Sequence, residues 1–448
     1  MPRKACLTLA LLIAAAPLWG QADANGSEPA SPLIDATMLV PPPVSGQSYP
    51  TALGSDERSN FLRYGLSFNS AYSDNSLGGS APVSDVSYSI WPTIALDQRT
   101  TRLHTVLSYA PGFTFYQRNT SRDEADQNLS FSVSERLSPH VTVSGSDGLH
   151  KSSSVFNQLD YGSGGVSGGA GGGNSTVIAP VSPFLSNSAN VDFSYQFAAN
   201  GMIGASGTFT NLHYYNSAEV TGLADSSSQG GSVFYSLRAS RLHYFGVTYQ
   251  YQRLVSSSAT VGESETQTDA IVFYYTLYPT STLSISAFGG PQHANTVQGA
   301  LGGLPLPPAI SWNPSVGGSV SWQGQLTNIA LSYSHSISGG GGLSGAVHSD
   351  NASLSLRRRI TRTLDGSISG GYAENNVLGS PLFGGGGDGH SLFGTASLSK
   401  QLGEHINLQV GYSRIHQDYS NVAVLAATPD TNRESISISY TFSRPLGR

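Results

Sequence analysis

One pattern repeats from about residue 60 to the end of the chain: short segments in which apolar and polar residues alternate. In the last segment, Ile436, Ile438, Tyr440 and Phe442 alternate with serine and threonine. A period of two places one class of residue on each face of a β-strand. A chain made of many such strands, with almost no helical stretch, must form a sheet that closes or stacks, because every strand has an apolar face to cover.

About eighteen segments carry this alternation, and each has roughly the length that crosses a bilayer at a tilt. The segment boundaries also allow a count of sixteen. The predicted strands cover residues 60–72, 84–96, 102–116, 127–137, 140–147, 188–198, 201–213, 230–238, 243–253, 266–278, 282–290, 315–323, 328–337, 350–358, 363–373, 390–399, 405–416 and 433–443.

The connections between these segments are alternately short and long. Short turns include Ser138-Pro139 and Ala199-Asn200. The long loops cover about 73–83, 117–126, 148–187, 214–229, 254–265, 291–314, 338–349, 374–389 and 417–432. Strict alternation gives the sheet two different ends, as in membrane barrels whose short turns face the periplasm and whose longer loops face outward. We therefore expect an all-β fold: a single transmembrane up-and-down antiparallel β-barrel of about eighteen strands, with an even count returning both ends of the barrel to the periplasm.

Composition agrees with a wall that meets lipid. Only 11% of the 448 residues are charged, whereas soluble domains average about 25%. The 22 Tyr and 17 Phe argue against a disordered chain. Beyond the N-terminus no apolar run approaches the roughly 18 residues that a transmembrane helix needs, so strands are expected to cross the membrane.

The first residues have the features of a secretory signal. Arg3 and Lys4 precede an apolar run over residues 5–16, and Ala22-Asp23-Ala24 offers a cleavage site with small residues. We therefore predict a signal peptide over residues 1–24, with a buried N-terminal helix as the less favoured alternative.

Residues 25–59 are rich in proline and lack periodicity. Pro41-Pro42-Pro43 favours an extended stretch, so this segment is predicted to be a flexible periplasmic arm. The barrel is then predicted over residues 60–448. The only cysteine is Cys6, inside the predicted signal, which excludes disulfides and thiol chemistry from the mature chain.

The final strand ends aromatic-x-aromatic, with Tyr440 and Phe442 as the two aromatic residues. Together with the barrel pattern, this strand resembles those of bacterial outer-membrane β-barrel proteins of the porin-like type. The resemblance implies a cell outer-membrane location and an assembly signal, centred on Tyr440 and Phe442, that the barrel-assembly machinery recognises.

The resemblance also suggests a constriction. In general porins the third outer loop folds into the lumen, and residues 148–187 form the third and longest loop here. Its charged residues are Lys151 and Asp160, and residues 162–174 are mostly glycine. These two residues are the candidates for a constriction site. A surface flap is the alternative, because the glycine-rich segment is flexible.

Charge is distributed between the two predicted ends. Acidic residues gather in the long loops and basic residues at the short turns, within a net charge of −6. An acidic outer rim could attract cations or hold divalent ions that bridge lipopolysaccharide, or it could serve only to keep the loops soluble. The run Arg357-Arg358-Arg359 has no aromatic platform beside it, so we expect no nucleic-acid partner.

The sequence shows no signature of an enzyme. The 11 histidines are scattered without H-x-H or H-E-x-x-H spacing, which argues against a metal site. Serine is so frequent that a Ser near a His carries no information. We therefore expect no catalytic residue, metal or cofactor.

The predicted function is a porin-like outer-membrane channel for passive diffusion of small hydrophilic solutes, because a barrel of this strand number has a water-filled lumen unless something fills it. Two alternatives remain: a barrel that exports a polymer such as an exopolysaccharide, and a structural or adhesive protein with a filled lumen. The expected partners are outer-membrane lipid, lipopolysaccharide, the barrel-assembly machinery and small solutes. The pattern specifies neither the solute nor the oligomeric state.

Overall fold

The structure is a computed structural model. It describes residues 60–76, 82–152, 183–215, 223–258, 262–298, 308–339, 342–343, 345–378, 389–419 and 430–446. The predicted signal peptide (1–24) and periplasmic arm (25–59) lie outside these residues.

Eighteen antiparallel strands form one sheet. They are β1 (Phe61–Ser73), β2 (Asp85–Arg99), β3 (Leu103–Tyr116), β4 (Glu124–Arg136), β5 (Val141–Ser152), β6 (Phe184–Ala198), β7 (Gly201–Tyr214), β8 (Asp225–Arg238), β9 (His243–Ser258), β10 (Gly262–Thr280), β11 (Leu283–Gln298), β12 (Ala309–Gln323), β13 (Thr327–Gly339), β14 (Ala346–Arg359), β15 (Leu364–Val377), β16 (Gly389–Gln401), β17 (Ile406–Tyr419) and β18 (Thr431–Pro445). A short 3₁₀ turn, η2 (Thr120–Arg122), precedes β4.

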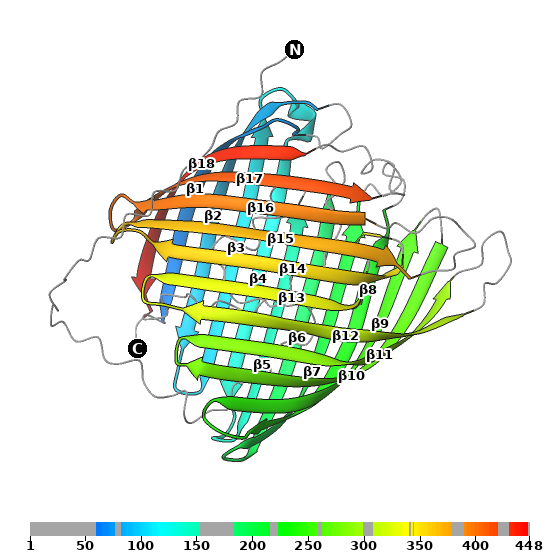
Figure 1. Ribbon diagram of the computed structural model, residues 1–448. Coiled ribbons are helices and arrows are strands. Elements are labelled where there is room, and N and C mark those ends of the chain that lie inside the picture. The colour runs from blue at the N-terminus through cyan, green and yellow to red at the C-terminus, as the bar shows by residue number, and fades with distance from the viewer. Residues whose placement is uncertain are drawn as a thin grey trace. The chain divides into compact units, whose positions relative to one another are not determined.

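Each strand pairs with its neighbours in the chain, and β1 closes the ring by pairing with β18 from Phe61↔Pro445 to Ser73↔Arg433 (Figure 1). Closure leaves no edge strand, so every strand can satisfy its backbone hydrogen bonds within the wall. The expected fold, a closed up-and-down barrel of eighteen strands, is confirmed.

The alternation in the sequence sorts residues to the two faces of the wall. Leu66 and Phe68 on β1 are 53% and 44% exposed on the outside, next to Pro92 and Ile90 of β2. Comparable large apolar side chains are exposed on the outer face all around the barrel. The inner face carries mostly serine, threonine, glycine, asparagine and glutamine. This wall, apolar outside and polar inside, belongs to a protein that spans the bacterial outer membrane.

The two ends of the barrel differ as expected. The short turns lie at the same end as the start of β1 and the end of β18. One predicted long loop is wrong. The segment 254–265 is mostly strand, because β9 continues to Ser258 and β10 begins at Gly262. Other strands also extend toward the long-loop end. β11 reaches Gln298 rather than residue 290, and β6 starts at Phe184 rather than residue 188.

Hydroxyl groups on the inner face bind one another across neighbouring strands. Ser206 and Ser232 lie 2.7 Å apart, and Ser332 and Ser353 lie 2.6 Å apart. The other cross-strand hydroxyl pairs are Thr266–Thr296, Thr276–Ser286, Ser367–Ser397 and Ser369–Thr395. Such pairs stabilise neighbouring strands, and each paired hydroxyl has a protein partner in place of water.

Inner-face aromatic rings lie against glycines of the adjacent strand. The Phe234 ring of β8 covers Gly204 of β7, where a Cβ atom would overlap the ring and the carbonyl oxygen of Phe193. The same arrangement recurs at Trp91–Gly112, Tyr274–Gly246, Phe288–Gly317 and Phe393–Gly371. A glycine lets the ring lie flat on the wall, so a bulky side chain occupies little of the lumen.

Within the described residues, no helix is both long enough and apolar enough to cross a membrane.

These contacts predict a stability difference between two glycines. Gly204→Ala should destabilise the barrel by about 1–3 kcal/mol, because the added methyl group overlaps both a ring and a backbone oxygen. Gly394→Ala is the matched control, since nothing lies within 4 Å of a Cβ at that strand position. The control should be neutral or slightly stabilising. Urea unfolding in detergent or lipid measures both, and equal midpoints would refute the packing role of Gly204.

Candidate functional site in the lumen

The β13–β14 hairpin leaves the wall near the long-loop end. β12 and β13 pair from Gln323↔Asn328 only as far as Val316↔His335. β13 and β14 remain paired with each other up to Gly339↔Ala346. The end of this hairpin is therefore detached from β12. We call residues 336–347 the hairpin tip; residues 340, 341 and 344 within it lie outside the described part of the chain.

The hairpin tip lies against the inner face of β9 and β11, four and two places from β13 around the ring. Ile337 is 3% exposed and packs with Leu254 of β9 and Ala294 of β11, both inner-face residues. The Ile337 amide donates a hydrogen bond to Oε1 of Gln292 (3.0 Å), and the Gly345 amide donates one to Oγ of Ser256 (2.7 Å). The tip is thus fixed inside the barrel by backbone hydrogen bonds and by apolar contacts.

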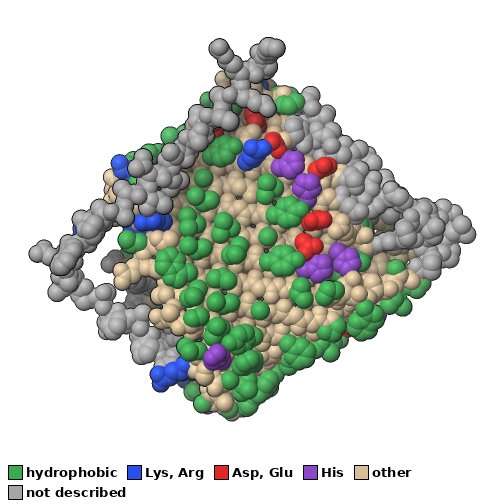
Figure 2. All heavy atoms as spheres, viewed as in Figure 1, with side chains coloured by type: hydrophobic (Ala, Val, Ile, Leu, Met, Phe, Trp, Pro, Cys, Tyr) green, Lys and Arg blue, Asp and Glu red, His purple; other side chains and the backbone are tan. Residues whose placement is uncertain are grey.

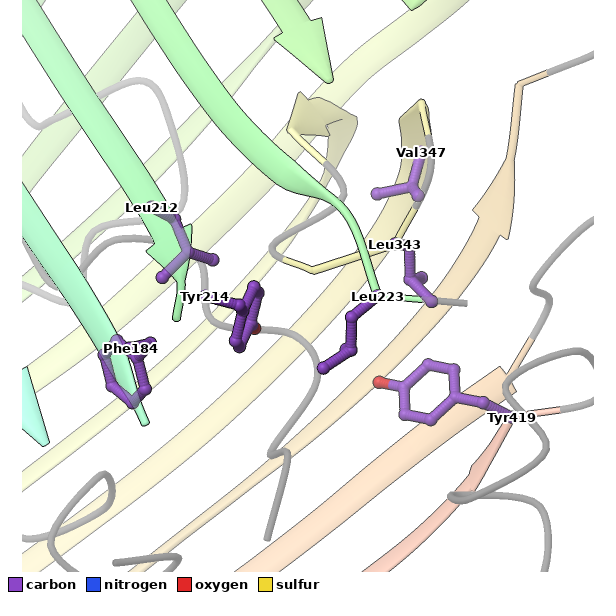
Figure 3. Packing of buried hydrophobic residues seen from close by; sticks show 7 residues of the cluster. All are labelled: Phe184, Leu212, Tyr214, Leu223, Leu343, Val347 and Tyr419. Carbon is purple, nitrogen blue, oxygen red and sulfur yellow. The ribbon is translucent and has the colours of Figure 1, made fainter. Parts of the chain in front are cut away.

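Apolar side chains connect the tip to two parts of the wall that lie far apart around the ring (Figure 3). We call this group the lumen cluster. Its members are Phe184, Leu212, Tyr214, Leu223, Leu343, Val347 and Tyr419. Phe184, Leu212 and Tyr214 come from β6 and β7, and Val347 and Tyr419 come from β14 and β17. Six strands lie between these two groups in either direction around the ring, so the cluster bridges the lumen.

Polar contacts extend the bridge at both sides. The Ala224 amide donates a hydrogen bond to the carbonyl oxygen of Gly342 (2.9 Å), which joins the segment before β8 to the tip. On the other side Nδ2 of Asn375 donates to the Tyr419 hydroxyl (3.4 Å), and Oγ of Ser349 donates to Oδ1 of Asn375 (2.8 Å). Leu223, Leu343, Val347 and Tyr419 are at most 2% exposed, so water does not enter the bridge itself.

The inner wall is covered on one side and accessible on the other. On β10 every inner-face residue from Ser264 to Thr276 is buried. On β6 the inner-face residues from Ser186 to Gln196 remain partly exposed, and those of β5 do as well. The lumen is therefore packed along β10 and reached by solvent beside β4–β6.

On the outer face, a row of titratable side chains lies at the long-loop end. Across β13–β17, directly paired positions hold His335, Asp350, Glu374, His390 and Asp418. Nδ1 of His335 lies 2.9 Å from Oδ1 of Asp350. Figure 2 shows histidine and acidic side chains along one side of the apolar surface. Among the described residues, the expected concentration of acidic groups near the long loops is therefore present on the outer wall.

The predicted site residues have different outcomes. Lys151 lies on β5 with its side chain on the outer face, where its ammonium group is 5.6 Å from the Tyr215 ring centroid. Asp160 lies outside the described residues, so a constriction by the third loop stays a prediction. Tyr440 and Phe442 point outward on β18, 50% and 44% exposed, next to His405. Their role in assembly also stays a prediction.

Sequence reasoning missed the residues that bridge the lumen. Leu223, Leu343 and Val347 fall within segments predicted to be long loops, and loops carry no periodic signal. A usable signal was present nonetheless: Leu343 and Val347 are apolar residues within a stretch otherwise made of glycine, serine and alanine. Within the described residues, no group of three or more His, Asp or Glu side chains has the geometry to hold a metal ion.

No protein-family model matches this sequence, and no curated protein matches it. Solved structures give distant likenesses only. OccAB4 of Acinetobacter baumannii is 7% identical with a TM-score of 0.40, covering 86% of this chain and 99% of its own. The outer membrane protein OpdK of Pseudomonas aeruginosa is 10% identical with a TM-score of 0.39, at 86% and 99% coverage. The FrpB iron transporter of Neisseria meningitidis is 10% identical with a TM-score of 0.42, at 82% and 62% coverage.

Proposed function

We propose that this protein is a porin-like channel through which small hydrophilic solutes diffuse passively across the outer membrane. The observation that carries the proposal is the solvent-accessible, polar inner face of β4–β6, which runs from the short-turn end toward the lumen cluster. Barrels of this strand number are wide enough to hold water and solutes. Polar side chains replace part of the hydration shell of a passing solute.

The hairpin tip would set the width of the passage. It lies within the barrel at the long-loop end and covers the inner faces of β9 and β11. Solutes would then pass beside the tip, along β4–β6. A narrow passage of this kind suits small solutes and excludes bulky ones.

A second candidate is a structural or adhesive protein with a filled lumen, and the lumen cluster is the observation that favours it. If the bridge closes the whole cross-section, no solute passes. Polymer export, the other alternative, has no specific observation in its favour.

The finer partners are also proposals. The outer wall contacts membrane lipid, and we infer that the row from His335 to Asp418 meets the headgroup layer of the outer leaflet, where lipopolysaccharide is the expected lipid. The barrel-assembly machinery would recognise β18 through Tyr440 and Phe442.

Conductance and solute uptake separate the channel from the filled barrel. Purified protein in planar bilayers should give discrete ion conductance, and liposomes that contain it should swell in small sugars but not in large ones. A protein that folds, as shown by the heat-dependent shift of its band on a gel, yet stays silent in both assays would refute the channel and support a filled lumen.

Truncating buried side chains of the hairpin tip tests whether the tip limits the passage. The double variant Leu343→Ala, Val347→Ala removes two buried side chains from the bridge. Truncating a buried leucine to alanine lowers stability by about 2–5 kcal/mol. The tip should therefore pack less firmly in the lumen, and single-channel conductance should rise. The control is Leu331→Ala, Leu354→Ala, which truncates two exposed residues on the outer face of β13 and β14, the two strands of the same hairpin. Equal conductance in both variants would show that the tip does not limit the passage.

The hydrogen bond from the Gly345 amide to Ser256 is expected to hold the tip in place. Ser256→Ala leaves the Gly345 amide without its acceptor, a loss of about 1–3 kcal/mol for a buried donor. Hydrogen exchange in the tip should therefore accelerate. Ser257→Ala, on the exposed outer side of β9, should leave exchange unchanged. Unchanged exchange in both variants would mean that other contacts suffice to hold the tip.

A further inference from the structure

The inner wall contains one charged side chain in its middle zone. Asp192 is the ninth residue of β6, between Phe184 and Ala198, and its side chain shares the inner face with Asn190 and Ser194. The outer-face neighbours Val191 and Phe193 are 57% and 42% exposed, which fixes the direction of Asp192 by alternation.

Other charged inner-face side chains lie near the strand ends. At the short-turn end they are Arg63, Asp97, Arg99, Arg136, Arg238, Arg357, Arg359 and Asp365, and at the long-loop end they are Asp85, Glu124, Asp126 and Arg433. Between these two zones, the described inner wall has no other Asp, Glu, Lys or Arg.

The carboxylate of Asp192 has a neutral environment. Nδ2 of Asn190 donates a hydrogen bond to it. The directly paired inner-face positions on β5 and β7 are Ser144 and Ser206. No Lys or Arg in the described part of the chain forms an ion pair with it, so its charge is not neutralised by the wall.

Asp192 also faces the part of the lumen that solvent reaches. Inner-face residues are partly exposed from Asn128 to Ser134 on β4, from Thr142 to His150 on β5 and from Ser186 to Gln196 on β6, whereas those of β10 from Ser264 to Thr276 are buried. A fixed charge in a narrow, water-filled passage acts on every ion that passes within about one Debye length, roughly 10 Å at 0.1 M salt. Low-dielectric walls concentrate its field in the passage.

We propose that Asp192 is the residue that determines charge selectivity, and that the passage prefers cationic and neutral polar solutes to anions. This inference rests on the proposed channel function and goes beyond it by naming the class of solute and the responsible side chain. It also places the conducting path along β4–β6 rather than along β9–β11.

The experiment is a reversal-potential measurement with the full-length protein in planar bilayers, under a KCl gradient near 0.1 M. Wild-type protein should be cation-selective, and Asp192→Asn should lower the potassium-to-chloride permeability ratio by about twofold or more. At 1 M salt, where the Debye length falls to about 3 Å, wild-type protein and the variant should converge. Asp192→Glu keeps the charge and should keep the selectivity.

Asp147→Asn is the matched control. Asp147 lies on β5, next to β6, but faces outward and accepts a hydrogen bond from Asn187 (3.0 Å). Removing its charge should leave the reversal potential unchanged. Asp192→Ser is a second neutral variant in case Asp192→Asn fails to fold, since serine already occupies the directly paired positions Ser144 and Ser206.

The outcomes are distinguishable. Conductance with the same reversal potential in wild-type protein, Asp192→Asn and Asp192→Ser would overturn the role of Asp192 and leave the channel standing. An equal shift in Asp147→Asn would overturn it too, because an outward charge would then act as strongly. Folded wild-type protein without conductance would overturn the channel and the selectivity together.

Discussion

The constraint on which this structure depends is that lipid supplies no hydrogen-bond partners. Every backbone N–H and C=O within the membrane must be satisfied by the protein itself, and the pairing of β1 with β18 does this for the two strands that would otherwise be edges. Closure in turn gives the wall an outside and an inside, and it gives the barrel two ends. The exposed Leu66 and Phe68 outside, the serine-rich surface inside, and the turns and loops at opposite ends all follow from it.

The strands could be predicted from the sequence where one face meets lipid, because lipid enforces an apolar residue at every second position. The prediction failed where strands continue beyond that zone. On β11, the outer face past Gly290 carries Pro291, His293 and Asn295, while the inner Ala294 is only 1% exposed under the hairpin tip. Polar groups now lie outside and a buried residue inside, so the alternation that marks a lipid-facing strand is lost while the hydrogen-bond ladder continues. For the same reason, residues 254–265 at the end of the β9–β10 hairpin were predicted to be a loop, although most of them are strand.

The candidate site was largely beyond sequence reasoning, since it depends on contacts between segments far apart in the chain. The Gly345 amide binds Ser256, and Leu343 packs in a cluster with Tyr214 and Tyr419. No local pattern encodes these partners. Local sequence explains only how the tip can turn. Gly342 and Gly345 have φ values of 109° and 106°, a region that disfavours residues with a Cβ. The apolar residues beside these glycines then find cover within the lumen rather than in water.

The serine and threonine residues of the inner wall occur both where it is buried and where it contacts water. Serine and threonine are small, and on this wall their hydroxyls bind one another across strands, as in Thr266–Thr296 and Ser369–Thr395. A hydroxyl that already has a partner can be buried at little cost. Beside β10 much of this surface is covered: Thr266 and Thr276 have hydroxyl partners and are 1% and 3% exposed, whereas the hydroxyls of Ser264 and Thr248 are buried without a partner among the described residues. Beside β5 and β6 the same residue types remain in contact with water. Because this lining can be either buried or exposed to water, inward packing of the hairpin tip can divide the lumen without a separate core. In the middle zone of the described inner wall, the carboxylate of Asp192 is then the one charged group on a neutral surface.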